Sequence, residues 1–214
     1  MFHTGGGTTL PDQSAQTLIL NAAKACYLRQ GVAKTTAADI ANEAGISRAT
    51  LYRRFPSHGD IFLAVLARDS WEMVADCEAK LSGITDPAEH VIEGILVVLD
   101  EIVRRPLHAH VFAESGGSWV LSQTMAAQTL HDMCIQMLHA MPGLRIVEGG
   151  EGERRVAYLA EWILRILASY AIAPSHLARN RDEMRELLHT TLEPTVRAIL
   201  KPAATGSSKS TIRR

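Results

Sequence analysis

Aromatic residues are scarce in this 214-residue chain, at 5% of positions, and cysteine occurs only three times, as Cys26, Cys77 and Cys134. No two cysteines have the Cys-x-x-Cys spacing of a zinc ribbon or a thioredoxin-type site, so neither kind of site is supported. Unpaired, widely spaced thiols are typical of a reducing compartment. No run of about 18 apolar residues occurs, and the Gly- and Thr-rich start lacks the basic and apolar regions of a secretory signal. We therefore expect a cytoplasmic protein that does not span a membrane.

Sequence motifs of common enzymes are missing as well. The glycine triplet at residues 5–7 has no following Lys-Ser or Lys-Thr, and no Gly-x-Ser-x-Gly element occurs. His108 and His110, with Glu114 nearby, raise the alternative of a metal site. Helix positions two apart point about 200° away from each other, so these two histidines are not expected to share an ion. We expect no enzymatic activity, no cofactor and no metal.

Apolar residues, by contrast, make up 47% of the chain and recur at helical spacing between Gly and Pro breakers. No alternating strand pattern is visible, so we expect an all-α fold. In the first helix, Leu18, Ala22, Ala25 and Leu28 are expected to form the buried face. The expected helices span residues 12–30 (with Asp12 or Ser14 as the cap), 36–44, 47–55, 57–81, 86–105, 107–114, 122–141, 153–173 and 181–200, the last one bent at Pro194.

The net charge of −1 conceals an uneven distribution. Residues 1–60 carry +2, residues 61–200 carry −7, and residues 201–214 carry +4. A basic N-terminal module on an acidic body is what a DNA-binding domain joined to a second domain would show, although a charge run can also be a solvated surface.

The most informative segment is residues 35–55, TTAADIANEAGISRATLYRRF. Thr36 and Asp39 have the spacing of a capping box, and Gly45 provides a tight turn before a further helix that starts at Ser47. Ile40, Ala41 and Leu51 are expected to point inward. A short helix, a glycine-containing turn and a second helix form the helix-turn-helix signature, in which the second helix enters the major groove of DNA.

Residues 18–66 resemble the N-terminal domain of the TetR family of regulators. The resemblance rests on Thr36-x-x-x-Ile40-Ala41, on the run from Ala44 to Ser47, and on Thr50-Leu51-Tyr52-x-x-Phe55. It implies an N-terminal three-helix DNA-binding domain, a helical C-terminal domain for effector binding and dimerisation, and repression as the default mode of action. The expected domains are a disordered arm (1–11), the DNA-binding domain (12–58), the effector and dimerisation domain (59–200) and a disordered basic tail (201–214).

The resemblance also implies which residues contact DNA. Thr36 and Tyr52 correspond to phosphate contacts, although Tyr52 could instead be a core aromatic. Arg48, Ala49 and Thr50 correspond to the base-reading region, and Arg53 and Arg54 could equally be solvated. The family usually has Lys followed by Glu where this chain has His58 and Gly59, and a neutral imidazole brings no charge to a phosphate. The expected DNA-contacting set is Lys34, Thr36, Ser47, Arg48, Ala49, Thr50, Tyr52, Arg53 and His58.

The C-terminal helices are expected to bind a ligand and a second copy of the chain. The helices at 153–173 and 182–200 have wide apolar faces, with Leu164 and Leu188 among them, and the resemblance implies a four-helix dimer bundle. Such a homodimer would place two recognition helices on a palindromic double-stranded operator. The middle helices would enclose a small, largely apolar effector, with simple core packing as the alternative. Candidate lining residues are Trp71, Met73, Leu96, Val111, Phe112, Trp119, Met125, Met133, Met137 and Trp162.

One alternative class remains open at this point. A helical small-molecule-binding protein or enzyme without DNA binding would share the composition and the periodicity. The recognition-helix pattern favours the transcriptional regulator.

Overall fold

The computed structural model describes residues 12–113, 128–141 and 150–199. The expected arm at 1–11 and tail at 201–214 lie outside the described residues, as do Trp119 and Met125. The described residues are mostly helical, as expected, and contain no strand. These helices are α1 (Asp12–Gln30), α2 (Ala37–Glu43), α3 (Arg48–Arg54), α4 (His58–Leu81), α5 (Pro87–Arg104), α6 (Pro106–Ala113), α8 (Gln128–Ala140), α9 (Glu151–Ile172), α10 (Arg181–Thr191) and α11 (Glu193–Ile199).

Helix caps explain most of these boundaries. Capping boxes begin α2 at Thr36 and α4 at Ser57, each with an aspartate three residues later that accepts a hydrogen bond from the cap's backbone N–H. Asp86 caps α5, whose first residue is Pro87. The expected bend near Pro194 is a break at Leu192, which separates α10 from α11. Helix α9 begins two residues earlier than expected, after Gly150.

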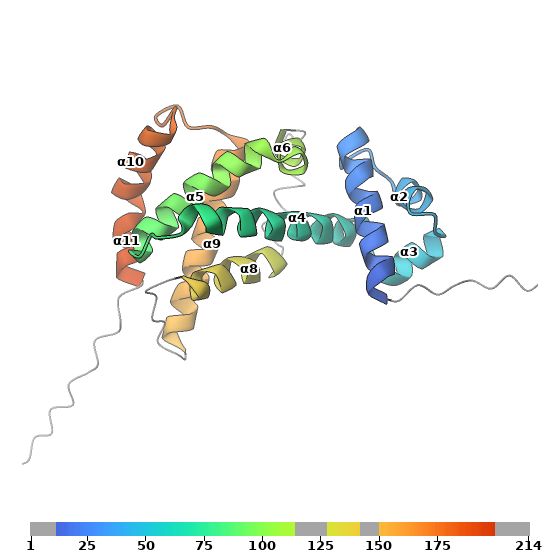
Figure 1. Ribbon diagram of the computed structural model, residues 1–214, viewed down its shortest axis with the longest axis horizontal. Coiled ribbons are helices and arrows are strands. Elements are labelled where there is room, and N and C mark those ends of the chain that lie inside the picture. Colours follow the sequence, from blue (N-terminus) through green and yellow to red (C-terminus); the bar gives the residue numbers. More distant parts are fainter. Residues whose placement is uncertain (1–11, 114–127, 142–149, 200–214) are drawn as a thin grey trace, which may run out of the picture.

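The long helix α4 joins two groups of helices (Figure 1). Helices α1, α2 and α3 lie at one end of α4, whereas α5, α8, α9, α10 and α11 lie along its other part. One core cluster contains the apolar side chains of α1–α3 together with Phe62 and Val65 from the start of α4. The same cluster includes Leu107 of α6 and Leu130 and Met133 of α8. The group of α1, α2 and α3 therefore packs directly against α6 as well as against α4.

The buried face of α1 differs from the expected one. Ile19, Ala23, Cys26 and Tyr27 are fully buried, whereas Leu18 and Leu28 are both more than a third exposed. Ala22 of the expected stripe is buried, but α1 carries apolar residues on more than one side, so periodicity alone did not identify the face that packs. The expectation for Leu18 and Leu28 was wrong because α2 and α4 cover the neighbouring face.

Two residues expected on a dimer face also lie elsewhere. Leu188 is only 2% exposed and belongs to a core cluster of α5, α8, α9, α10 and α11 within the same chain. Leu164 lines an internal cavity. Helix α10 packs on α5 through Arg181, whose guanidinium pairs with Glu93 and Asp100.

Candidate functional site

The turn between α2 and α3 has the geometry of a helix-turn-helix. Gly45 has a φ of 64°, in the left-handed region that glycine adopts without steric cost. The backbone N–H of Gly45 donates to the carbonyl of Asn42 at 3.1 Å, and that of Ile46 donates to the carbonyl of Ala41 at 3.0 Å. These two bonds form a Schellman motif, which ends α2 and redirects the chain into α3. Ile40, Ala41 and Leu51 are buried beneath the turn, as the sequence predicted.

The outer face of α3 carries positive charge and short polar side chains. Helix α3 contains no acidic residue, and Arg48, Ala49 and Arg53 are exposed on it. Tyr52 is 41% exposed, so it is not a core aromatic. Lys34 and Thr36 are also exposed, just before α2. An exposed helix with positive charge and short polar side chains is suited to enter the major groove of DNA.

Three hydroxyl groups in this region already have partners. Thr36 Oγ1 donates to Asp39 Oδ2 at 2.7 Å and accepts from the backbone N–H of Asp39 at 3.2 Å. Ser47 Oγ caps α3 by accepting from the backbone N–H of Thr50, and it lies 3.0 Å from Thr50 Oγ1. Ser47 and Thr36 thus fix the starts of the two helices of the motif.

His58 points at a neighbouring ring and not away from the domain. Its ring meets that of Tyr27 edge to face, with 5.7 Å between the centroids, and its Nε2 lies 3.4 Å from the Tyr27 hydroxyl oxygen. Burial lowers the pKa of His58 below its usual value. An imidazole held neutral in this way contributes packing to the α1–α4 contact and no charge to a phosphate.

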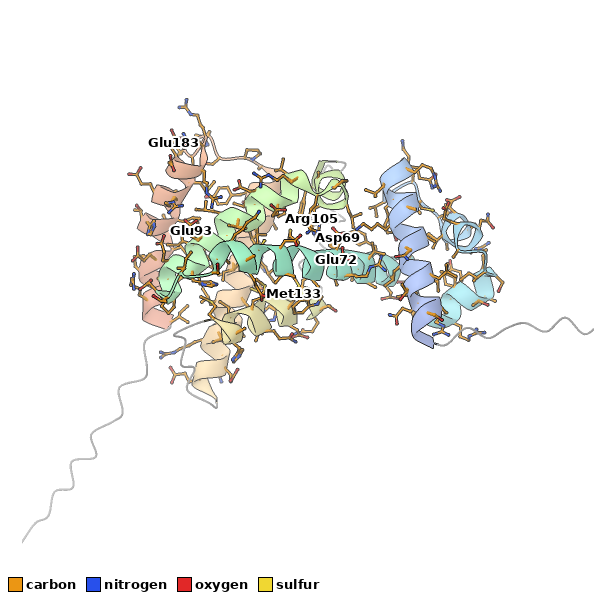
Figure 2. All side chains as sticks on the ribbon, viewed as in Figure 1. Asp69, Glu72, Glu93, Arg105, Met133 and Glu183 are labelled. Atoms are coloured by element: carbon orange, nitrogen blue, oxygen red, sulfur yellow. The ribbon has the colours of Figure 1, made fainter. Side chains whose placement is uncertain are left out.

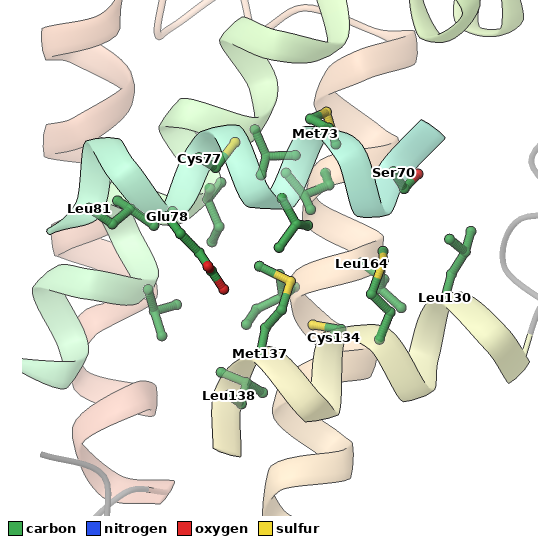
Figure 3. A pocket seen from close by; sticks show the side chains of 18 of the residues that line it. Ser70, Met73, Cys77, Glu78, Leu81, Leu130, Cys134, Met137, Leu138 and Leu164 are labelled. Atoms are coloured by element: carbon green, nitrogen blue, oxygen red, sulfur yellow. The ribbon is translucent and has the colours of Figure 1, made fainter. Parts of the chain in front are cut away.

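A cavity of about 420 Å³ lies between α4, α5, α6, α8 and α9. Figure 3 shows its wall, with Ser70 of α4 near one end and Glu78 of α4 reaching toward Met137 of α8 at the other. The lining is apolar apart from a few groups that include Ser70, Glu78, His90 and His108. Such a cavity has the size and the mixture of groups of a small-molecule site.

The candidate lining residues divide into three groups. Met73, Phe112, Met133 and Met137 line the cavity. The lining does not include Trp71, Leu96 or Trp162. Leu96 is buried in the core, whereas Trp71 and Trp162 are 42% and 52% exposed. The side chain of Val111 lies outside the described part of the structure, as do Trp119 and Met125.

A polar chain that the sequence reading missed leads from the cavity to α1. Asp69 of α4 is 3% exposed and lies, in Figure 2, on the part of α4 nearer α1. Its Oδ1 pairs with Lys24 of α1, and its Oδ2 lies 2.9 Å from His108 Nδ1 of α6, at ion-pair distance although not as a well-aligned hydrogen bond. His108 Nε2 in turn lies 3.1 Å from Ser70 Oγ. Ser70 and His108 both line the cavity.

The charge of Asp69 is stabilised by these partners. Burial alone would raise its pKa, but its close contacts with His108 and Lys24 lower the pKa to about 2. A sequence signal for this cluster existed. Leu66, Asp69, Ser70 and Met73 follow the i, i+3, i+4, i+7 spacing of one helix face, so two polar residues interrupt an otherwise apolar stripe.

The thiols of the cavity are neutral. Burial raises the pKa of Cys134 to about 12 and also raises the pKa of Cys77. Neither thiol is a thiolate at neutral pH, so both serve as soft apolar lining.

Comparisons with known proteins agree with this geometry. The family model described as bacterial regulatory proteins, tetR family, matches residues 19–65. An uncharacterized HTH-type transcriptional regulator of Mycobacterium tuberculosis is 24% identical over 192 residues, which cover 90% of this chain and 88% of the relative. The TetR-family repressor QsdR of R. erythropolis has a similar structure, with a TM-score of 0.63 and 18% identity over 89% of this chain and 96% of that one. The repressor AlkX of Dietzia sp. gives a TM-score of 0.57 and 18% identity over 92% of this chain and 100% of that one.

The exposed recognition helix and these similarities define a helix-turn-helix transcriptional regulator that binds DNA. The similarity to the tetR family of bacterial regulatory proteins is carried by residues 19–65. No helix in the described ranges is both long enough and apolar enough to span a membrane.

Proposed function

We propose that the protein is a homodimeric repressor that binds a palindromic operator and releases it when a small, largely apolar molecule enters the cavity. The observation that carries the DNA-binding part is the outer face of α3, where Arg48, Tyr52 and Arg53 are exposed and no acidic residue intervenes. Lys34 and Thr36 at the start of α2 complete a surface suited to phosphates on either side of the groove.

The homodimer is supported by an exposed aromatic pair on α9. Tyr158 is 62% exposed and Trp162 is 52% exposed, and the two lie one helical turn apart on the same side. Large aromatic side chains on one exposed face are typical of an interface between subunits. A second copy related by a twofold axis would cover them and would bring the second α3 to the other half of a palindrome.

Release by a ligand is supported by the path from the cavity to the DNA-binding domain. Ser70 and His108 line the cavity, and Asp69 connects His108 of α6 to Lys24 of α1. A ligand that shifts α6 or α4 therefore changes the contact that holds α1 in place. Such coupling is typically about 1–3 kcal/mol and is reciprocal, so operator DNA would weaken ligand binding by the same factor.

The decisive experiment is selection of bound sequences from random duplex DNA with the full-length protein. We expect enrichment of a palindrome with half-sites about 10 base pairs apart, or a multiple of that spacing. The enriched duplex then serves in a release assay against a library of small apolar compounds.

The outcomes separate the two parts of the proposal. No enriched sequence, together with clear binding of a compound, would instead indicate a helical ligand-binding protein without DNA binding. If a palindrome is enriched but no compound releases the protein from it, the proposal of a DNA-binding regulator stands and the proposal of an apolar effector fails.

A further inference from the structure

We propose that the cavity selects a neutral apolar molecule bearing one hydroxyl group, and that this hydroxyl donates a hydrogen bond to Nε2 of His108. This inference rests on the proposed function, because it names the chemical class of the effector. The ligand would lie with its hydroxyl at the Ser70 end of the cavity and its apolar body along α8.

The first argument is the hydrogen-bonding state of His108. Its Nδ1 lies 2.9 Å from the carboxylate of Asp69, which can only accept. When the ring carries a single proton, that proton therefore belongs on Nδ1, and Nε2 is left as an acceptor that faces the cavity. Ser70 Oγ, 3.1 Å away, is then the donor to Nε2 within the protein. A ligand hydroxyl can take over this role or donate to Ser70 itself.

The second argument is the lack of a cationic group. Neither Lys nor Arg is among the described residues that line the cavity. A carboxylate ligand would lose its hydration without gaining a fixed positive partner, which is strongly unfavourable. Glu78 at the other end adds a negative charge, and the charge of Lys24 behind His108 is already paired with Asp69.

The remaining titratable groups do not change this balance. His90 lies with Nδ1 3.3 Å from the carbonyl oxygen of Ile84, a partner to which a ring N–H donates. Cys77 and Cys134 are neutral thiols for the reason given above. The electrostatics of the cavity thus favour a neutral ligand over a fatty-acid type of anion.

The third argument is the shape and softness of the wall between these ends. Ser70 and Glu78 are eight residues apart on α4, which corresponds to about 12 Å along a helix. Met73, Met133, Met137 and Met141 line the cavity, and thioether sulfur makes favourable contacts with aromatic rings. An aromatic alcohol with a short alkyl chain matches both the length and the lining.

The test compares three probes with the full-length protein by titration calorimetry, at a mildly alkaline pH that lies above the ordinary imidazole pKa of about 6.5. The probes are para-pentylphenol, its methyl ether, and para-pentylbenzoate. We expect the phenol to bind on the order of tenfold more tightly than the ether, because the ether leaves the buried acceptor without a donor. We expect the benzoate to bind more weakly than either.

Variants then assign the preference to His108. His108→Asn keeps an N–H that can donate to Asp69 but lacks the second ring nitrogen. The ratio of the phenol's affinity to the ether's affinity should therefore fall to about one. Ser70→Ala frees Nε2, so the ratio should be kept or increased. Met137→Leu is the matched control in the same cavity, and it should alter both affinities while leaving the ratio unchanged.

A second readout does not depend on the stability of the His108 variant. Glu78→Gln should strengthen binding of the benzoate and leave the phenol-to-ether ratio as in the wild type. Any of four results would overturn the inference. The phenol and the ether could bind with equal affinity, or the benzoate could bind more tightly than the phenol. The phenol could fail to bind up to its solubility limit, or His108→Asn could leave the ratio of the two affinities unchanged. Operator binding is measured separately, so loss of the hydroxyl preference with intact DNA binding overturns this inference and not the proposed regulator.

Discussion

Lys24 of α1 and Asp69 of α4 form an ion pair across the junction between the DNA-binding domain and the rest of the protein. The Asp69 side chain is almost fully buried, whereas the lysine is about one third exposed. The same carboxylate is approached from the other side by His108 of α6. One buried charge therefore connects α1, α4 and α6, because moving any of the three helices would take away at least one of its two partners.

Asp69→Asn should lower the free energy of unfolding by about 2 kcal/mol at neutral pH, because the folded state holds the pKa of Asp69 at about 2. The contribution of ionised Asp69 to stability is complete above the unfolded-state pKa of about 3.9, and it is lost as the pH falls toward the folded-state pKa. Urea unfolding at neutral and acidic pH measures it. The matched control is Glu72→Gln, since Glu72 is 57% exposed and lies 4.0 Å from the same lysine. The control should lose less than about 1 kcal/mol, and equal losses for the two variants would contradict the assignment.

The pH dependence of stability near neutrality should depend on His58. Its folded-state pKa is lowered by burial, so the unfolded chain binds the proton more readily. Stability should therefore fall as the pH drops below the ordinary imidazole value of about 6.5. His58→Gln keeps a polar group near the Tyr27 hydroxyl but does not titrate, so its melting temperature should fall less over this range. Parallel pH profiles for wild type and variant would show that His58 is not the group responsible.

The helix boundaries were predictable because they depend on local chemistry. Thr36 with Asp39, and Ser57 with Asp60, fix helix starts through contacts three residues apart, and Gly45 fixes a turn through its own φ angle. These signals lie entirely within a short stretch of sequence.

The faces of the helices were less predictable because they depend on what packs against them. Trp162 and Leu188 are both apolar residues on C-terminal helices, yet Trp162 is exposed and Leu188 is core. Nothing within either helix distinguishes the two, because α5 packs on both α9 and α10 and only the side chains that face a neighbouring helix become core. The role of Asp69 could not be derived either, because its partners are 45 residues before it and 39 residues after it in the chain.

Two glycines should respond in opposite ways to alanine. Gly94 lies within α5, and an added Cβ would meet only the Leu81 side chain, at 3.7 Å. Gly94→Ala should raise the free energy of unfolding by about 0.5–1 kcal/mol through helix propensity. Gly45→Ala has open space around the added carbon, yet its φ of 64° should make the variant about 1–2 kcal/mol less stable. Urea unfolding compares them, and destabilisation by both would mean that the wall of the cavity at Gly94 does not accept a methyl group.

Charge on the exposed face of α9 should separate the proposed dimer without unfolding the chain. Tyr158→Glu and Trp162→Glu place carboxylates where the chain alone leaves aromatic surface open, so we expect folded monomers by sedimentation and unchanged helical circular dichroism. Leu188→Glu is the contrasting control. Its side chain is core within one chain, so this variant should unfold. A wild-type monomer at micromolar concentration would remove the homodimer from the proposal.

The recognition helix should contain one base-reading residue and separate backbone contacts. Arg48 is the first residue of α3 after the Ser47 cap, and its exposed side chain can reach a guanine edge, which is worth about 1–3 kcal/mol of discrimination. Arg48→Ala should therefore relax the preference at one symmetric operator position.

Tyr52 and Lys34 provide the comparison for Arg48. Tyr52→Phe removes a neutral hydroxyl from an exposed side chain, so it should weaken all sequences about equally and leave the salt dependence unchanged. Lys34→Ala should reduce the slope of log affinity against log salt by about 0.9, the value for one neutralised phosphate. Affinities for the selected operator and a scrambled duplex across a salt series distinguish these effects. Equal weakening of both duplexes by Arg48→Ala would make Arg48 a backbone contact and would move base reading to another part of α3.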